Sequence, residues 1–273
     1  MKNILTVDLE DWYHICSLAD AHNACGKDKL ENRLIANTDR LLRLFREHNT
    51  KVTFFVLGVI AEKNVSLIKR IFDEGHEICS HGYSHKILMD LSPETFRCEL
   101  RKTDRILKSI TGYSPLGFRA PSFSVTAATE WALDILAEEE YVYDSSIFPV
   151  RRSEGGFPGM PSDPFTLRLK SGKSIKEFPI TTARILGRNI PFSGGGYLRV
   201  YPYCIVSYFF KALNKENKQV ISYIHPRDID KEQPRLRMPF LNKLKTYSGL
   251  AKTETKLRRL LEEFKFYPIR DFL

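Results

Sequence analysis

The sequence predicts an α/β protein built from parallel strand–helix units. Short segments rich in β-branched and aromatic residues alternate with longer segments whose apolar residues recur at helical spacing. Charged and histidine side chains also follow several of the predicted strands directly. In parallel α/β proteins the carboxyl ends of the strands are where functional groups collect, so the two observations support the same class.

The first half of the chain carries the clearest alternation. Residues 4–7 predict a strand that ends in the acidic cluster Asp8-Leu9-Glu10-Asp11. Ser92-Pro93 is a typical start of a helix, because Ser caps a helix N-terminus and Pro suits its first turn. The predicted elements up to residue 144 are helices at 31–48, 59–73, 93–111 and 126–140, and strands at 52–57, 77–79, 116–119 and 141–144.

The second half is less regular. Residues 150–200 contain Gly155-Gly156 and Gly194-Gly195-Gly196, and we expect them to form loops around a strand at 175–180. Beyond them the pattern predicts a helix at 203–213, a strand at 219–224 and a final helix at 248–264.

Size and composition fit one large globular domain. The 273 residues are 42% hydrophobic, and the formal charge is +9. The five cysteines are scattered without a CxxC pair, and we find neither a secretory leader nor an apolar run long enough to span a bilayer. We therefore expect a cytoplasmic protein. The basic residues of the final helix favour a solvated face, with contact to anionic lipid as the alternative.

The most informative motif contains His81 and His85. On a helical turn, residues four apart lie on one face, so both imidazoles could bind the same metal ion. The acidic cluster after the first strand offers a further ligand and a general base. Asp8 and Glu10 face the same way on a strand, whereas Asp11 could reach the site if the chain turns. Asp8, Glu10 and Asp11 are therefore the candidates for the third ligand and the base.

Two further groups stand at strand ends. His225 follows the apolar strand 219–224, and Arg119 emerges from the strand 116–119. A buried guanidinium needs a carboxylate partner, and we expect Asp8 to be that partner.

As a set, these segments resemble the polysaccharide deacetylase family, carbohydrate esterase family 4, to which chitin and peptidoglycan deacetylases belong. The resemblance rests on Thr6-Val7-Asp8-Leu9-Glu10-Asp11, Ser80-His81-Gly82-Tyr83-Ser84-His85, Arg119-Ala120-Pro121-Ser122 and Tyr223-Ile224-His225. Further segments are similar to the exosortase-linked bacterial exopolysaccharide branch of the family: Tyr143-Asp144-Ser145-Ser146, Glu177-Phe178-Pro179, Gly195-Gly196-Tyr197-Leu198-Arg199 and His225-Pro226-Arg227-Asp228.

The resemblance implies a distorted (β/α)7-type barrel with a loop-rich C-terminal elaboration. It also implies a single catalytic domain over residues 1–273, with the core motifs at 4–230 and a C-terminal helical extension at 231–273.

The resemblance also implies roles for the candidate residues. Asp8 would be the base, Arg119 its orienting partner and His225 the acid that protonates the departing amine. Asp144 would either orient His225 or contact the sugar. His81 and His85 would bind a divalent metal ion with Glu10 or Asp11; zinc is favoured, with Co²⁺, Ni²⁺ or Mn²⁺ as alternatives. The residues expected to contact the substrate are Ser122, Phe123, Tyr197 and Arg199. A backbone N–H near Ser122 would hold the oxyanion.

The implied reaction is removal of the N-acetyl group from an amino sugar, in an exopolysaccharide or its lipid-linked precursor. We expect a saccharide rather than nucleic acid as the partner, with a peripheral contact to the inner membrane left open and no prediction of oligomeric state. Two alternatives are a deformylase or other amide hydrolase acting on a lipid-linked amino sugar, and a saccharide-binding protein with a vestigial site.

Overall fold

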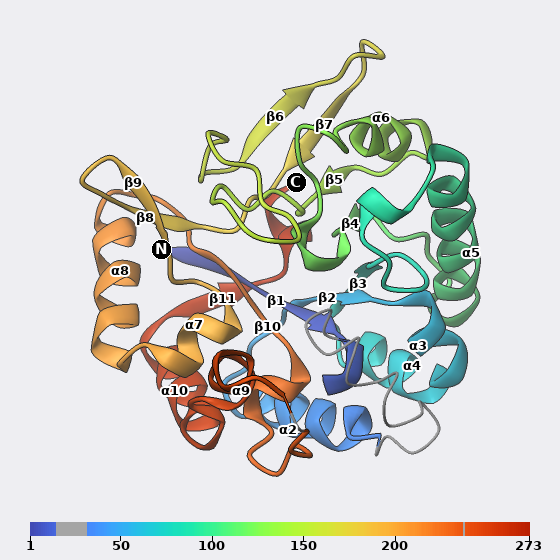
Figure 1. The fold of residues 1–273 in the computed structure, drawn as a ribbon. Helices are drawn as coiled ribbons and strands as arrows, with labels where there is room; N and C mark the ends of the chain where they lie inside the picture. Colours follow the sequence, from blue (N-terminus) through green and yellow to red (C-terminus); the bar gives the residue numbers. More distant parts are fainter. Residues whose placement is uncertain (15–31, 237) are drawn as a thin grey trace.

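The computed structural model describes residues 1–14, 32–236 and 238–273, and its centre is a curled, mostly parallel sheet (Figure 1). The strands pair in the order β10-β1-β2-β3-β4-β5-β7, all parallel. Their bounds are β1 (Lys2–Leu9), β2 (Thr53–Val56), β3 (Glu77–Ser80), β4 (Gly117–Phe118), β5 (Tyr143–Asp144), β7 (Ser174–Glu177) and β10 (Ile221–Ile224). This confirms the predicted α/β class.

Irregular backbone links the two ends of this sheet. After β7 the chain runs beside β10, where the Thr181 N–H donates to the Ile221 carbonyl at 3.2 Å. The Tyr223 N–H donates to the Ser193 carbonyl at 3.1 Å from the same side of β10. The distorted barrel implied by the resemblance is therefore confirmed.

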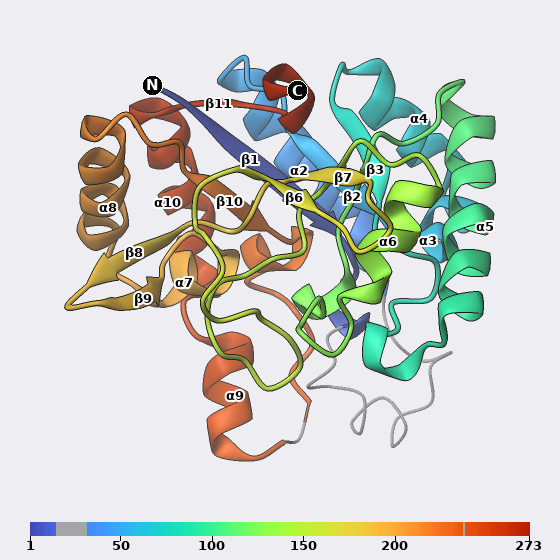
Figure 2. The same cartoon turned by 90° about the horizontal axis from the view of Figure 1, so that it is seen from above.

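Helices surround this sheet (Figures 1 and 2). They are α2 (Leu34–Glu47), α3 (Gly58–Lys63), α4 (Val65–Asp73), α5 (Pro93–Thr111), α6 (Trp131–Glu138), α7 (Gly195–Val200), α8 (Tyr203–Lys215), α9 (Phe240–Tyr247) and α10 (Leu250–Glu263). Short 3-10 turns lie at Trp12–His14, Leu88–Asp90, Pro121–Phe123, Pro226–Ile229 and Ile269–Phe272. The start of α5 is as predicted, because the Ser92 hydroxyl accepts a hydrogen bond from the Thr95 N–H at 3.2 Å.

Strand periodicity decides which side chains face the barrel interior. Leu5, Val7 and Leu9 of β1 pack outward in the core shared with the helices. Thr6 and Asp8 alternate with them and are also buried, on the opposite face of the strand. A strand buried on both faces needs polar partners for its inward polar groups, and those partners form the candidate site.

Several segments differ from the sequence prediction. The expected helix 59–73 is two helices, α3 and α4, because the backbone departs from helical dihedrals at Asn64. The expected loops contain β6 (Phe165–Arg168), a hairpin of β8 (Thr182–Ile185) and β9 (Arg188–Pro191), and α7. The C-terminal extension is not purely helical: β11 (Lys265–Tyr267) pairs in parallel with β1. Within the described ranges, no helix combines the length and the apolar character needed to cross a membrane.

Candidate active site

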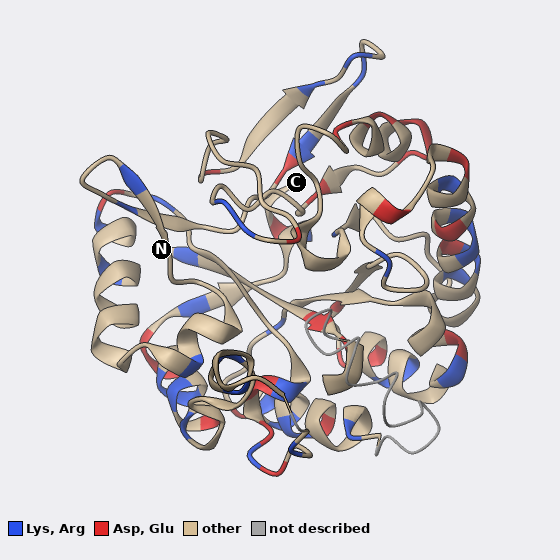
Figure 3. Cartoon of the chain, viewed as in Figure 1, with Lys and Arg blue, Asp and Glu red and all other residues tan. Residues whose placement is uncertain are grey.

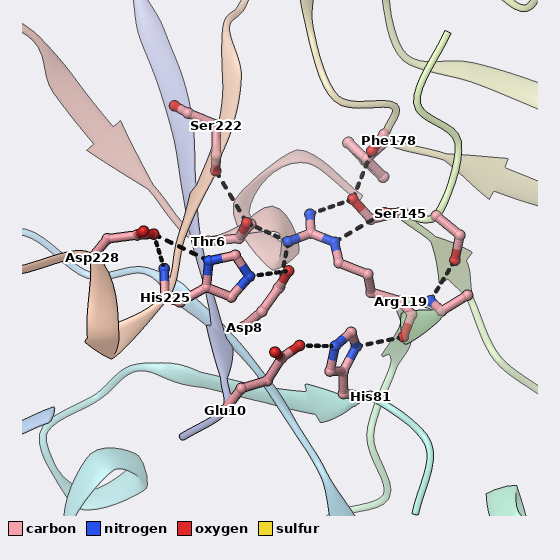
Figure 4. A network of polar contacts seen from close by, with 12 residues as sticks. Thr6, Asp8, Glu10, His81, Arg119, Ser145, Phe178, Ser222, His225 and Asp228 are labelled. Carbon is pink, nitrogen blue, oxygen red and sulfur yellow. Dashed lines mark hydrogen bonds and ion pairs between the residues drawn. The ribbon is translucent and has the colours of Figure 1, made fainter. Parts of the chain in front are cut away.

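The ends of four strands bring the predicted groups together on one rim of the barrel (Figure 4). Asp8 lies near the end of β1, while His81, Arg119 and His225 directly follow β3, β4 and β10. The parallel register aligns these ends, since Val7 pairs with Ile224. The sequence argument from strand ends is confirmed for these four residues.

Arg119 is the buried cation of the site, with no exposed surface. Its Nη1 donates to Asp8 Oδ1 at 2.7 Å and to the Thr6 hydroxyl at 2.6 Å. Its Nε and Nη2 donate to the backbone carbonyl and the hydroxyl of Ser145. The guanidinium also stacks on the Phe55 ring at 4.1 Å. The expected Arg119–Asp8 pair is confirmed, and the other contacts fix its direction.

Glu10 is the carboxylate that joins the histidine pair. Its Oε1 lies 2.9 Å from Nε2 of both His81 and His85. Burial raises the pKa of Glu10, but the charge of His85 and hydrogen bonds from both rings outweigh it and lower this pKa well below its ordinary value. An ionised carboxylate therefore faces two imidazole nitrogens.

The two histidines converge through a loop and not on a helix. Residues 81–87 have no helical turn, and Gly82 and His85 adopt positive φ values of 75° and 63°. The expected helical face is therefore wrong as the reason for their proximity. Two left-handed positions bend the chain after β3, so both rings face Glu10.

The donor set of Glu10, His81 and His85 fits a divalent metal ion. His81 Nδ1 lies 2.7 Å from the Arg119 carbonyl, which only accepts, so Nδ1 carries the hydrogen. In neutral His81 the Nε2 lone pair would then face the anionic Glu10 oxygen directly. A proton on Nε2 or a metal ion would remove this repulsion, and two imidazole nitrogens with one carboxylate oxygen are typical ligands of zinc and related ions.

His225 stands opposite this cluster, on the other side of Asp8. Its Nε2 lies 4.0 Å from Asp8 Oδ2, and its Nδ1 lies 3.1 Å from Asp228 Oδ2. Burial lowers the pKa of His225, but Asp228, Glu10 and Asp8 reverse this and raise it above its ordinary value. The other oxygen of Asp228 is 2.9 Å from Arg199 Nε, so a cation fixes the carboxylate that holds the ring.

A cleft of about 590 Å³ opens over these groups. Asp8, Glu10, His85 and His225 line its polar floor. Its walls include four residues predicted to contact substrate: Ser122, Phe123, Tyr197 and Arg199. The structure thus brings the predicted acid, the predicted base, two of the candidate metal ligands and the predicted substrate contacts to one opening.

The turn at Ser122 and Phe123 is conformationally unusual. Both residues adopt positive φ, 56° and 55°, which is costly for side chains larger than glycine. Gly155 packs against this turn: a Cβ at Gly155 would contact the carbonyl oxygens of Phe123 and Ser122. The strained turn is held where it forms one wall of the cleft.

Asp11 lies outside the metal cluster. Its carboxylate accepts hydrogen bonds from the backbone N–H groups of Trp12, Arg33 and Leu34, at 2.8, 3.1 and 3.2 Å. The chain does turn after β1, as that alternative required, but the turn directs Asp11 to the N-terminus of α2. Burial raises the pKa of Asp11 to about 6. Of the two alternatives, the geometry brings only Glu10 to the histidines.

Asp144 is buried behind the site and does not contact His225. Its oxygens accept from the Ser146 hydroxyl at 2.6 Å and the Ser146 N–H at 3.0 Å, and the Ser146 hydroxyl in turn accepts from the Ala120 N–H. Burial raises the pKa of Asp144 and of the neighbouring Glu177. Asp144 therefore supports the turn after Arg119. Asp228 occupies the position beside His225 that one of the two alternatives gave to Asp144.

Sequence reasoning missed several contributors to the cleft, among them Asp228, Arg152 and Lys245. Asp228 had a usable signal, since an acid three residues after a strand-end histidine can return to its ring. Arg152 and Lys245 also line the cleft, from segments without a motif. Arg199 is at the cleft as expected, but its guanidinium is directed to Asp228 and to backbone carbonyls of residues 245 and 246.

Two family models match the chain. Residues 31–139 match the polysaccharide deacetylase model, and residues 145–273 match a domain of unknown function (DUF3473). The peptidoglycan-N-acetylglucosamine deacetylase of Bacillus cereus is 42% identical over 84 residues, which cover 31% of this chain and 30% of that protein. The chain thus spans about a third of the length of such curated relatives.

Solved structures agree with the fold across nearly the whole chain. A probable polysaccharide deacetylase from Pseudomonas aeruginosa PAO1 superposes with a TM-score of 0.65 at 17% identity, covering 99% of this chain and 88% of that one. A putative polysaccharide deacetylase from Mycobacterium smegmatis gives 0.63 at 21% identity, covering 99% and 89%. At these identities the likeness establishes the fold.

Proposed function

Because this chain belongs to the polysaccharide deacetylase family, we propose that it hydrolyses the N-acetyl group of an amino sugar in a bacterial polysaccharide or its lipid-linked precursor. The observation that carries the proposal is the common cleft of the Glu10–His81–His85 cluster, Asp8 and His225. Peptidoglycan deacetylation is what the names of curated relatives state for those proteins. The match to a domain found at the C-terminus of exopolysaccharide deacetylases favours an exopolysaccharide here.

In this proposal Asp8 is the general base. One of its oxygens is held by Arg119, and the other faces the cleft and can take a proton from the attacking water. The chemistry expected of an ion held by Glu10, His81 and His85 is Lewis-acid polarisation of the acetamide carbonyl, and zinc is the metal we favour over Co²⁺, Ni²⁺ or Mn²⁺.

His225 is the proposed acid. Asp228 holds its Nδ1, which leaves Nε2 facing Asp8 and the cleft. Nε2 can therefore deliver a proton to the amine as the C–N bond breaks, giving acetate and a free amino group. For the oxyanion we propose a backbone N–H at the Ser122 turn, and for the sugar ring the aromatic surfaces of Phe123 and Tyr197.

We propose that residues 1–273 act as one catalytic domain. β10 and β11, from the second half of the chain, both pair with β1 from the first half. A single sheet would then fix the positions of Asp8 and His225 relative to each other. The cytoplasm remains our proposed location, and the free thiols of Cys79, Cys98 and Cys204 are compatible with it.

The test is a product assay over N-acetylated and N-formylated saccharides, free and lipid-linked. We expect release of acetate in a one-to-one ratio with free amine. Release of formate alone would favour the deformylase alternative, and saccharide binding without any product would favour a vestigial site.

A further inference from the structure

Helix α9 presents its apolar face outward. Phe240, Leu241 and Leu244 are 71%, 68% and 45% exposed, whereas Thr246 on the opposite side of the helix is buried. Phe240 is four residues and Leu241 three residues before Leu244, so the three side chains form one stripe along the helix. A helix on the surface of a globular protein ordinarily directs such a stripe to the core, so this arrangement is inverted.

Basic side chains surround this stripe. Lys243 and Lys245 flank it on the helix itself, and both are exposed. Residues 231–252 contain six lysines and arginines against one acidic residue, Glu232. Figure 3 shows basic positions on α9 and on the segments of the chain next to it. An apolar stripe between cations is complementary to a surface that is apolar inside and anionic outside.

A second cavity, of about 690 Å³, lies between the end of α9 and the start of α10. Lys231, Arg235, Lys252 and Lys256 line it, and none of the described lining residues is acidic. Lys256 is committed to the carbonyls of residues 198, 199 and 201, whereas Lys231, Arg235 and Lys252 are exposed. The start of α10 adds the positive end of a helix dipole. The cavity suits a phosphate headgroup.

The helix is also adjacent to the catalytic cleft. Lys245 of α9 lines that cleft, and Arg199 and Val200 line both cavities. Figure 2 shows α9 projecting from the body of the protein.

We propose that α9 docks this protein on an anionic phospholipid bilayer, with Phe240, Leu241 and Leu244 in the interface and the basic cavity on lipid phosphates. The proposal rests on the proposed function in one respect: docking would bring a membrane-borne glycan to the cleft. Its test therefore measures binding and not turnover.

The experiment is sedimentation of the full chain with vesicles of phosphatidylcholine alone or with added phosphatidylglycerol. We expect binding to the anionic vesicles that weakens with salt. The triple variant Phe240→Ser, Leu241→Ser, Leu244→Ser should bind on the order of 100-fold more weakly, and Lys243→Glu should also reduce binding. Val65→Ser removes a similarly exposed apolar side chain on α4 and should leave binding unchanged.

Three results would overturn the proposal. The first is failure of the wild type to sediment with anionic vesicles, and the second is equal binding by the triple variant. The third is a wild-type dimer in analytical ultracentrifugation that the triple variant abolishes, because a second copy would then cover α9. Turnover of a soluble N-acetylated saccharide should be unaffected in the triple variant, so loss of docking and loss of the proposed reaction are distinguishable.

Discussion

Replacement of Arg119 by methionine should destabilise the protein far more than loss of an ordinary ion pair. The guanidinium is fully buried and donates to Asp8, to Thr6 and twice to Ser145. Methionine fills much of the same volume but leaves the 2%-exposed Asp8 carboxylate without its cation. Removing one partner of a buried pair costs about 3–5 kcal/mol. We expect a loss of that size in the free energy of unfolding.

A double-mutant cycle shows whether the cost arises from Asp8. Asp8→Asn removes the charge, so adding it to Arg119→Met should recover at least about 1.5 kcal/mol through coupling of the two sites. Urea unfolding followed by circular dichroism measures all four proteins. The control is Arg258→Met, which breaks an exposed pair with Glu47 and should change stability by less than about 1 kcal/mol. The assigned pairing would be refuted if Arg119→Met lowered the free energy of unfolding no more than the Arg258→Met control does. Strict additivity of the Arg119→Met and Asp8→Asn effects would refute it as well.

Three further predictions concern neighbouring features. Glu10→Ala should abolish metal binding. Asp11→Ala should retain metal binding but lower the free energy of unfolding by about 1–2 kcal/mol, because its carboxylate caps a helix. Metal content per chain and urea unfolding distinguish the two variants, and metal loss in Asp11→Ala alone would exclude Glu10 as the third ligand. Burial lowers the pKa of His76 from 6.5 to about 3. Between these two pH values the unfolded chain binds a proton at this ring that the folded chain does not bind. The contribution of His76 to the free energy of unfolding is therefore fully present above pH 6.5 and should fall by about 1.4 kcal/mol per pH unit toward pH 3. His76→Asn, which keeps an acceptor for the Val52 N–H, should flatten this dependence in unfolding measured at pH 5 and 7.5, and an unchanged slope would contradict the assignment. Gly155→Ala should push the loop off the Ser122–Phe123 turn and lower kcat/KM about tenfold or more; unchanged kinetics would mean that the turn does not shape the cleft.

The sequence was sufficient for features set by local pattern. Short β-branched strands, helical periodicity and the Ser92-Pro93 start predicted most of the first half of the barrel. Strand-end placement also predicted that Asp8, Arg119, His81 and His225 would meet, because parallel strands end on the same rim.

Features set by tertiary contacts were not predictable in this way. The route of the chain after β1 decides between Glu10 and Asp11, and it depends on where α2 begins. Asp144 follows a strand like the others, but β5 ends beneath the turn after Arg119, so its carboxylate is used there. The short strands β6, β8 and β9 lie in Gly- and Pro-rich or polar sequence, and they are held by pairing with neighbouring strands.

The measurement that tests the central claim most directly is acetate release from an N-acetylated saccharide by wild type, Asp8→Asn and His225→Asn, with free amine quantified in parallel. We predict equal amounts of acetate and amine from the wild type, and a fall in kcat of about 10²- to 10⁴-fold in each variant with its fold retained. Full turnover in Asp8→Asn, or acetate release independent of both side chains, would contradict the assignment of this cleft as the active site.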